Sequence, residues 1–217
     1  VQTLEVKSVA KSEYITGAQM KRADNTSKDK VSTSTTLSQL GYSGSDASFE
    51  VTNKETGKVS TISVSADTKV SDFVDQLKEA GLSANFDATN QRIFIASSKA
   101  GTDNAFDIKS KNADGDKALY ALGLSMDSTV YDSSSEKNNG NSRISAENAA
   151  IVLNGATYTS STNDFNINGV SITALGVTDA NESLTLTVTT DTQGLYDKVK
   201  SFLSSYNALI NEMTSLY

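Results

Sequence analysis

Side chains able to do acid–base chemistry gather in one short acidic stretch. Asp72, Asp75 and Glu79 follow one another at spacings of three and four residues, so on a helix they share one face. Paired carboxylates act as general acid and base in many hydrolases. The same spacing to Lys69 and Lys78 predicts surface ion pairs instead, each worth only about 0.3 kcal/mol. We favour the ion pairs, because carboxylates on a solvated helix face are common.

Metal and nucleophile chemistry has few candidates in this chain. Asn112, Asp114, Gly115 and Asp116 are similar to the start of a calcium loop, but the bidentate Glu at the required distance is missing, which favours a plain turn. The chain has no Cys and no His, so the usual donors for zinc, copper, haem and iron–sulfur clusters are absent, as are Cys–His and Ser–His–Asp nucleophiles. We therefore predict no enzyme, no metal site and no cofactor.

Length and charge exclude further classes of protein. A chain of 217 residues that is 37% hydrophobic forms two or three small folded domains. The net charge of −7 and the scattered lysines leave no basic field for nucleic acid. No apolar run approaches the roughly 20 residues that span a bilayer, so we expect no membrane partner. The absence of cysteine fits a reduced compartment or an export route without oxidative folding.

The central part of the chain predicts an α+β module. Alternating apolar residues on both sides of a turn at 53–57 indicate a β-hairpin. A helix capped by Asp67 or Thr68 follows, buries Val70, Phe73, Val74 and Leu77, and stops at Gly81. A strand around Phe86 and strands at 93–95 and 105–108 complete the order ββαβββ, and an apolar turn at 119–124 closes the module. The polar segments 21–36 and 127–142 read as surface connections.

An all-β segment follows, with a long helix after it. Short strands are predicted at 149–153, around 158, and at 165–167, 170–175 and 184–188, separated by Asn-Gly and Ser-rich turns. Asp191 or Thr192 then caps a helix with apolar residues at alternating spacings of four and three, the signature of coiled-coil packing: Leu195, Val199, Phe202, Tyr206, Leu209, Met213 and Leu216. Because the pattern still runs at Tyr217 and the chain begins at Val1, we expect a longer protein whose flanks supply partner helices.

Two strings of this sequence carry a family resemblance. Residues 146–217 contain NAAIVLNGATYTSSTNDFNINGVSIT and LYDKVKSFLSSYNALIN, and this stretch resembles the bacterial flagellar filament cap proteins, also called hook-associated protein 2. Residues 37–108 are similar to the motif inserted in flagellins and hook-associated proteins. The resemblance implies an extracellular protein of the bacterial flagellum tip that forms a homo-oligomeric ring and guides flagellin into the growing filament. Its partners are then other copies of itself and flagellin.

The resemblance also implies how the chain divides. We expect an α+β, mostly β fold with two small β-rich head domains, one inserted in the other, and a C-terminal coiled-coil-type helix. Residues 1–9 and 190–217 begin a helical leg, residues 10–39 and 126–189 form the inner head domain, and residues 40–125 form the outer one. The seven apolar residues at 195–216 are predicted to pack within the leg.

Other classes of protein remain open at this stage. Another flagellar axial protein, such as a junction protein or a flagellin variant, shares the inserted motif. A surface adhesin or carbohydrate-binding module, with host glycans as partners, fits acidic Ser/Thr-rich β domains with exposed Tyr. A hydrolase ranks third, because no pair of carboxylates, Ser–Lys or Tyr is spaced on one recognisable element.

Overall fold

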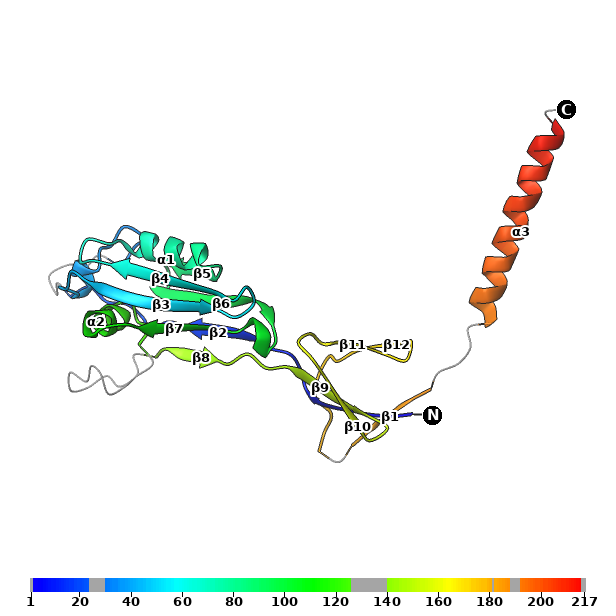
Figure 1. Ribbon diagram of the computed structural model, residues 1–217, viewed down its shortest axis with the longest axis horizontal. Coiled ribbons are helices and arrows are strands. Elements are labelled where there is room, and N and C mark those ends of the chain that lie inside the picture. Colours follow the sequence, from blue (N-terminus) through cyan, green and yellow to red (C-terminus); the bar gives the residue numbers. More distant parts are fainter. Residues whose placement is uncertain (1, 24–29, 126–139, 181, 188–191, 216–217) are drawn as a thin grey trace.

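The computed structural model describes residues 2–23, 30–125, 140–180, 182–187 and 192–215. A larger and a smaller β-rich unit are followed along the chain by one long helix, α3 (Thr192–Ser215) (Figure 1). Each β-rich unit has its own hydrophobic core. The predicted α+β, mostly β fold with a C-terminal helix is therefore confirmed.

The larger unit holds two antiparallel sheets and two helices around one core. One sheet has the order β5-β6-β2-β8, which joins β5 (Ser83–Asp87), β6 (Arg92–Ala100), β2 (Ser12–Thr16) and β8 (Ser142–Ile144). The other has the order β4-β3-β7, with β4 (Lys58–Val64), β3 (Ala47–Asn53) and β7 (Phe106–Ser110). The helices are α1 (Val70–Glu79) and α2 (Ala113–Ala121), and short 3₁₀ turns occupy Ser38–Leu40 and Thr102–Asn104.

The predicted order ββαβββ is confirmed as β3, β4, α1, β5, β6 and β7, which together span residues 47–110. The apolar face of α1 is buried as expected, and Phe73 packs edge-on against Phe49 of β3 with ring centroids 5.8 Å apart. The predicted cap was wrong. The N-cap residue is Lys69, whose backbone N–H is 3.3 Å from the Asp72 carboxylate, whereas the Thr68 hydroxyl accepts from the Ser65 N–H. Gly81 ends the helix with a positive φ of 88°.

Three sequence expectations for the larger unit were wrong. Residues 113–121 form a helix where turns were expected, because the Asn112 side chain accepts the Gly115 N–H and caps it. In the polar segment 21–36, whose residues 24–29 lie outside the described part, Val31 is buried in the core. The third difference is that the predicted module does not close by itself, since β2 and β8 complete one of its sheets.

The smaller unit is a four-stranded sheet with a hairpin over one face. Its order is β10-β9-β1-β13, which joins β10 (Ala156–Ser160), β9 (Ala149–Leu153), β1 (Gln2–Ser8) and β13 (Leu184–Leu186). The hairpin consists of β11 (Asp164–Ile167) and β12 (Val170–Thr173). All five predicted strand positions are confirmed, with the last strand ending at Leu186 and residue 188 of the prediction lying outside the described residues. Both Asn-Gly pairs, at 154–155 and 168–169, have positive φ at both residues, as two-residue hairpin turns require.

The two cores divide the chain at residues other than those expected from the resemblance. Strand β1 pairs with β9 and β13, so residues 2–8 lie in the smaller sheet where the start of a helical leg was expected. Strand β2 and Leu37 lie in the core of the larger unit rather than with residues 149–186. The reason is strand pairing. Strand β2 pairs with β6 on one side and β8 on the other, and its Ile15 is buried in the larger core.

Candidate functional site

The predicted leg residues lie on α3 with their side chains uncovered. Leu195, Val199, Phe202, Tyr206, Leu209 and Met213 expose from 51% (Val199) to 68% (Phe202) of their surface. Leu216 and the predicted cap Asp191 lie outside the described residues, and Thr192 is the first residue of the helix. None of the described residues of α3 is buried by the rest of the chain. These side chains line one side of the helix but contact no core.

A further row of apolar residues, missed in the sequence analysis, adjoins this line. Tyr196, Leu203 and Ile210 recur every seven residues, and they are 61%, 52% and 41% exposed. The sequence signal was available, since each of the three directly follows Leu195, Phe202 or Leu209. We call the nine residues together the α3 stripe: Leu195, Tyr196, Val199, Phe202, Leu203, Tyr206, Leu209, Ile210 and Met213.

The width of the α3 stripe bears on what can cover it. A two-stranded coiled coil buries two positions of every seven, whereas three of every seven form a stripe at least about 100° wide. Each apolar side chain gains about 1.5–3 kcal/mol on full burial. Isolated helices are marginal in water, so an uncovered helix of this kind is stabilised mainly by the partners it packs against. The stripe therefore suits a bundle with more than one neighbouring helix.

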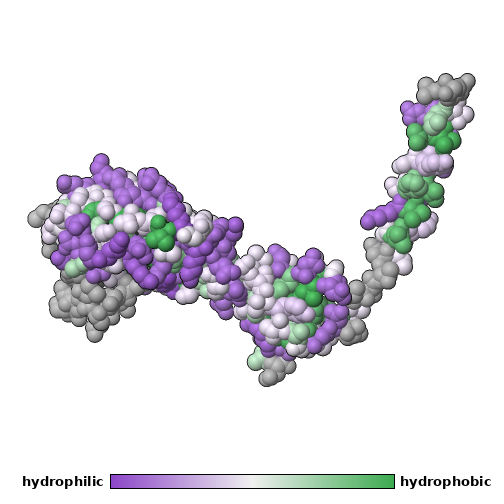
Figure 2. Space-filling model, viewed as in Figure 1, coloured by the Kyte–Doolittle hydropathy of each residue, from purple (hydrophilic) through white to green (hydrophobic). Residues whose placement is uncertain are grey.

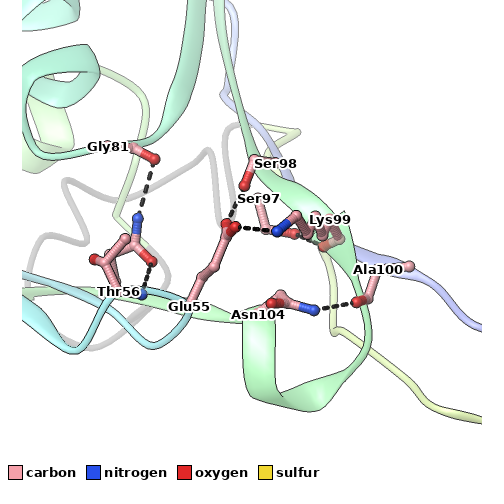
Figure 3. Close-up of polar contacts among 9 residues, drawn as sticks. Glu55, Thr56, Gly81, Ser97, Ser98, Lys99, Ala100 and Asn104 are labelled. Atoms are coloured by element: carbon pink, nitrogen blue, oxygen red, sulfur yellow. Dashed lines mark hydrogen bonds and ion pairs between the residues drawn. The ribbon is translucent and has the colours of Figure 1, made fainter. Parts of the chain in front are cut away.

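A polar cluster joins the turn between β3 and β4 to the far end of β6 (Figure 3). Glu55 reaches from the turn to β6, where its carboxylate accepts a hydrogen bond from the Ser98 hydroxyl and pairs with the Lys99 Nζ at 2.8 Å. Buried Asn53 donates to the Gly81 carbonyl at 3.0 Å and accepts from the Thr56 N–H at 3.3 Å. A serine beside a carboxylate and a lysine is the arrangement in the described residues that most resembles a nucleophile with its base.

The pKa shifts in this cluster oppose catalysis. Hydrogen bonds from Lys99 and then Ser98 lower the pKa of Glu55, so its carboxylate binds a proton less readily. The hydrogen bond to Glu55 and the charge of that carboxylate raise the pKa of Lys99, so its ammonium gives up a proton less readily. A general base works best with a pKa near the operating pH, and both groups shift away from neutrality. The cluster therefore acts as a clamp between the hairpin turn and β6.

The two acidic stretches of the sequence are helix surfaces. Asp75 pairs with Lys78 at 2.9 Å on α1, as one of the predicted ion pairs, and Asp114 pairs with Lys117 at 3.1 Å on α2. Within the described ranges, no group of three acidic side chains is arranged to hold a metal ion. In the same part of the chain, no helix combines the length and apolar character needed to cross a bilayer. The α3 stripe is thus the candidate functional site.

Comparison with known sequences shows that this chain is similar to flagellar proteins. Residues 146–217 match the family model described as flagellar hook-associated protein 2 C-terminus. A-type flagellar hook-associated protein 2 of Pseudomonas aeruginosa is 32% identical over 178 residues, which cover 72% of this chain and 35% of that protein. Flagellar hook-associated protein 2 of Salmonella typhimurium is 27% identical, over 86% of this chain and 39% of that protein. The chain thus spans about a third of the length of these curated relatives.

Solved structures show the same fold. The flagellar cap protein FliD D1-D2-D3 domains from Escherichia coli match with a TM-score of 0.65 and 23% identity, over 99% of this chain and 66% of that one. FliD (HAP2) from Pseudomonas aeruginosa PAO1 matches with a TM-score of 0.61 and 21% identity, over 96% and 88% of the two chains. The FliD D2-D3 domains from Serratia marcescens match with a TM-score of 0.58, over 87% of this chain.

Proposed function

This chain is a relative of flagellar hook-associated protein 2, and we propose that it serves as the head and the first leg helix of a flagellar filament cap. In this proposal the protein acts at the distal, extracellular end of the filament. Copies assemble into a homo-oligomer that promotes the polymerisation of flagellin. The work is done by surfaces that fit one another and not by a reaction at an active site.

The observation that carries the proposal is the exposed α3 stripe at the end of two β-rich units. The stripe lies within residues 146–217, the part of the chain that matches the family model. Its three-in-seven spacing supports a bundle in which α3 packs against helices from outside residues 1–217. The residues predicted to pack within the leg keep that role, and Tyr196, Leu203 and Ile210 join them. The two folded units then form a head held away from the filament by this leg.

Immunogold electron microscopy of filaments from the source bacterium tests where the protein acts. Antibody raised against this chain should label the distal end of each filament and nothing else. Label along the whole filament would indicate a flagellin variant, and label where the hook meets the filament would indicate a junction protein. Label on the cell body would instead support an adhesin, which a glycan-binding titration then checks.

Two matched variants test the role of the α3 stripe. Phe202→Asp places a charge at the most exposed residue of the predicted leg set, whereas Ser204→Asp places the same charge outside the stripe. We expect Phe202→Asp to release unpolymerised flagellin into the medium and to abolish swimming, because a buried unpaired charge is costly. Ser204→Asp should leave both unchanged. Equal motility in the two variants would refute packing through the stripe.

A further inference from the structure

One part of the smaller unit, residues 148–178, is nearly uncharged in a chain of net charge −7. Residues 148–178 contain one charged side chain, Asp164, which accepts a hydrogen bond from the Thr173 hydroxyl at 2.7 Å. The face shown in Figure 2 is mostly hydrophilic over the larger unit, whereas hydrophobic colour gathers on the smaller unit and α3. Two copies of an acidic chain repel where carboxylates face each other. Strands β9 to β12 therefore offer a surface on which copies can meet without that repulsion, whereas β1 carries Glu5 and Lys7, and Asp179 and Glu182 precede β13.

One edge of the smaller sheet is an unprotected strand. Strand β10 pairs with β9 on one side, and no described strand pairs with its other side. Its sequence, ATYTS, has neither a charge nor a proline, which are the devices that usually block pairing at an edge. Ala156 to Thr159 are exposed, and Tyr158 presents 37% of its surface. The strand offers free backbone donors and acceptors beside an aromatic ring.

The opposite edge exposes aliphatic side chains. Leu184 of β13 lies opposite Leu4 of β1 and is 52% exposed. Further along β1, the Val6 carbonyl accepts the Thr178 N–H at 3.1 Å, which places the segment before Thr178 on the same edge. In that segment Leu175 is 93% exposed and Val177 is 59% exposed. These three aliphatic side chains define the aliphatic edge.

The charges near the aliphatic edge disfavour contact between two aliphatic edges. Asp179 and Glu182 follow the segment that holds Leu175 and Val177, so two aliphatic edges brought together would oppose four carboxylates. Contact between an aliphatic edge and a β10 edge places the same carboxylates beside an uncharged strand. Unlike charges are not required for this contact, because the apolar side chains and the free strand supply the attraction.

We propose that the β10 edge of one copy binds the aliphatic edge of the next copy. Such a contact joins two different surfaces, so repeating it closes a ring or continues as a helix. The proposal rests on the proposed function, since a cap built from copies of one chain needs a contact of this kind. It assigns Tyr158 and the free side of β10 to one copy and Leu175, Val177 and Leu184 to its neighbour.

Engineered cysteines test the contact directly, because the chain has none of its own. Thr159→Cys places a thiol on the exposed β10 edge, and Gly176→Cys places one where an added Cβ meets no other atom within 4 Å. Full chains carrying one or the other, distinguished by tags of different size, are mixed and treated with a short bis-maleimide. We expect a cross-linked pair of unlike copies in the mixture and no pair in either variant alone. In the control mixture, Gly176→Cys is combined with Thr61→Cys in place of Thr159→Cys. Thr61 is an exposed residue of β4 in the larger unit.

Sedimentation velocity over a concentration series supplies the second readout. Thr159→Lys should raise the dissociation constant of self-association about tenfold, whereas Thr61→Lys should leave it unchanged. Circular dichroism confirms that each variant is folded, and Thr157→Cys and Thr157→Lys stand in if the Thr159 variants are not. Unchanged association of the Thr159→Lys chain would overturn the assignment.

The outcomes separate this contact from the proposed function. If the chain self-associates but the unlike pair never forms, or if Thr159→Cys links only to itself, the contact is overturned and the cap proposal stands. If the unlike pair forms while the antibody does not label filament ends, the contact stands and the cap proposal fails. A chain that stays monomeric at every concentration and gives no cross-link overturns the contact, and the cap proposal fails as well only if the antibody does not label filament ends.

Discussion

Arg143 should be the most sensitive polar residue of the larger unit. Its Nε donates to the Glu13 carboxylate at 2.6 Å, its second terminal nitrogen donates to the Phe106 carbonyl at 3.1 Å, and Asp107 lies 3.6 Å away. The Glu13 side chain is only 5% accessible, whereas the Arg143 side chain is 34% accessible. Arg143 thereby ties β8, where the chain leaves the larger unit, to β2 and β7.

Replacing Arg143 with Met leaves a buried carboxylate without its cation. Breaking a fully buried ion pair costs about 3–5 kcal/mol, and an exposed pair contributes about 0.2–1 kcal/mol. Because one partner is buried and the other one-third exposed, we expect the ion pair to account for about 2 kcal/mol. Loss of the hydrogen bond to Phe106 adds about 1 kcal/mol. Arg143→Met should therefore lower the free energy of unfolding of the larger unit by about 3 kcal/mol.

Hydrogen exchange of β6 peptides during urea unfolding measures this loss, since it follows the larger unit separately from the smaller one. The same replacement in a Glu13→Gln background should cost about 1 kcal/mol, because the neutral amide is less costly to leave unpaired. Lys78→Met breaks an exposed pair on α1 and serves as the control, with a change below about 0.5 kcal/mol. A loss below about 0.5 kcal/mol for Arg143→Met, or an equal loss in the Glu13→Gln background, would refute the reasoning.

Three further predictions concern the two cores and one turn. Phe73→Ala should destabilise the larger unit by about 4 kcal/mol and leave the exchange of β9 amides unchanged, because the ring is fully buried in the larger core alone. Ile151→Ala should cost the smaller unit about 3 kcal/mol, with β6 protection as the control, and a loss shared by both units would contradict separate cores. Hydrogen bonds from the Asn90 side chain and then from the backbone N–H groups of Asn90 and Thr89 lower the pKa of Asp87 below 3.8 in the folded protein. The resulting stability is present above pH 3.8 and lost as the pH falls through the folded pKa, so the stability difference between wild type and Asp87→Asn should shrink below pH 3.8 in acid titrations of urea unfolding.

Local patterns were sufficient to predict most individual elements. The hairpin of β3 and β4, the buried face of α1 and the five strands of the smaller unit all follow from apolar periodicity and turn residues a few positions apart. Helix α2 was missed because Asp114, Gly115 and Asp116, in its first turn, are residue types typical of turns. Its apolar face is also short. The signal that was overlooked is the Asn112 cap, which accepts the Gly115 N–H.

Long-range pairing was not predictable in the same way. Strand β2 lies between β6 and β8, more than seventy residues away in either case, and only the register of these pairs assigns it to the larger core. Strand β1 joins the smaller sheet through β9 and β13 for the same reason. Such pairings depend on the whole set of available edges, which a short window of sequence does not contain.

For the α3 stripe, the helical period and the identity of its residues are local properties, so they can be read from the chain in order. Whether those side chains are covered depends on every other surface of the chain. The two β-rich units bury their own apolar residues in two separate cores, and neither covers α3. That exposure, and the unlike edges of the smaller sheet, emerge only when the folded units are seen together, because burial is a property of packing and not of sequence position.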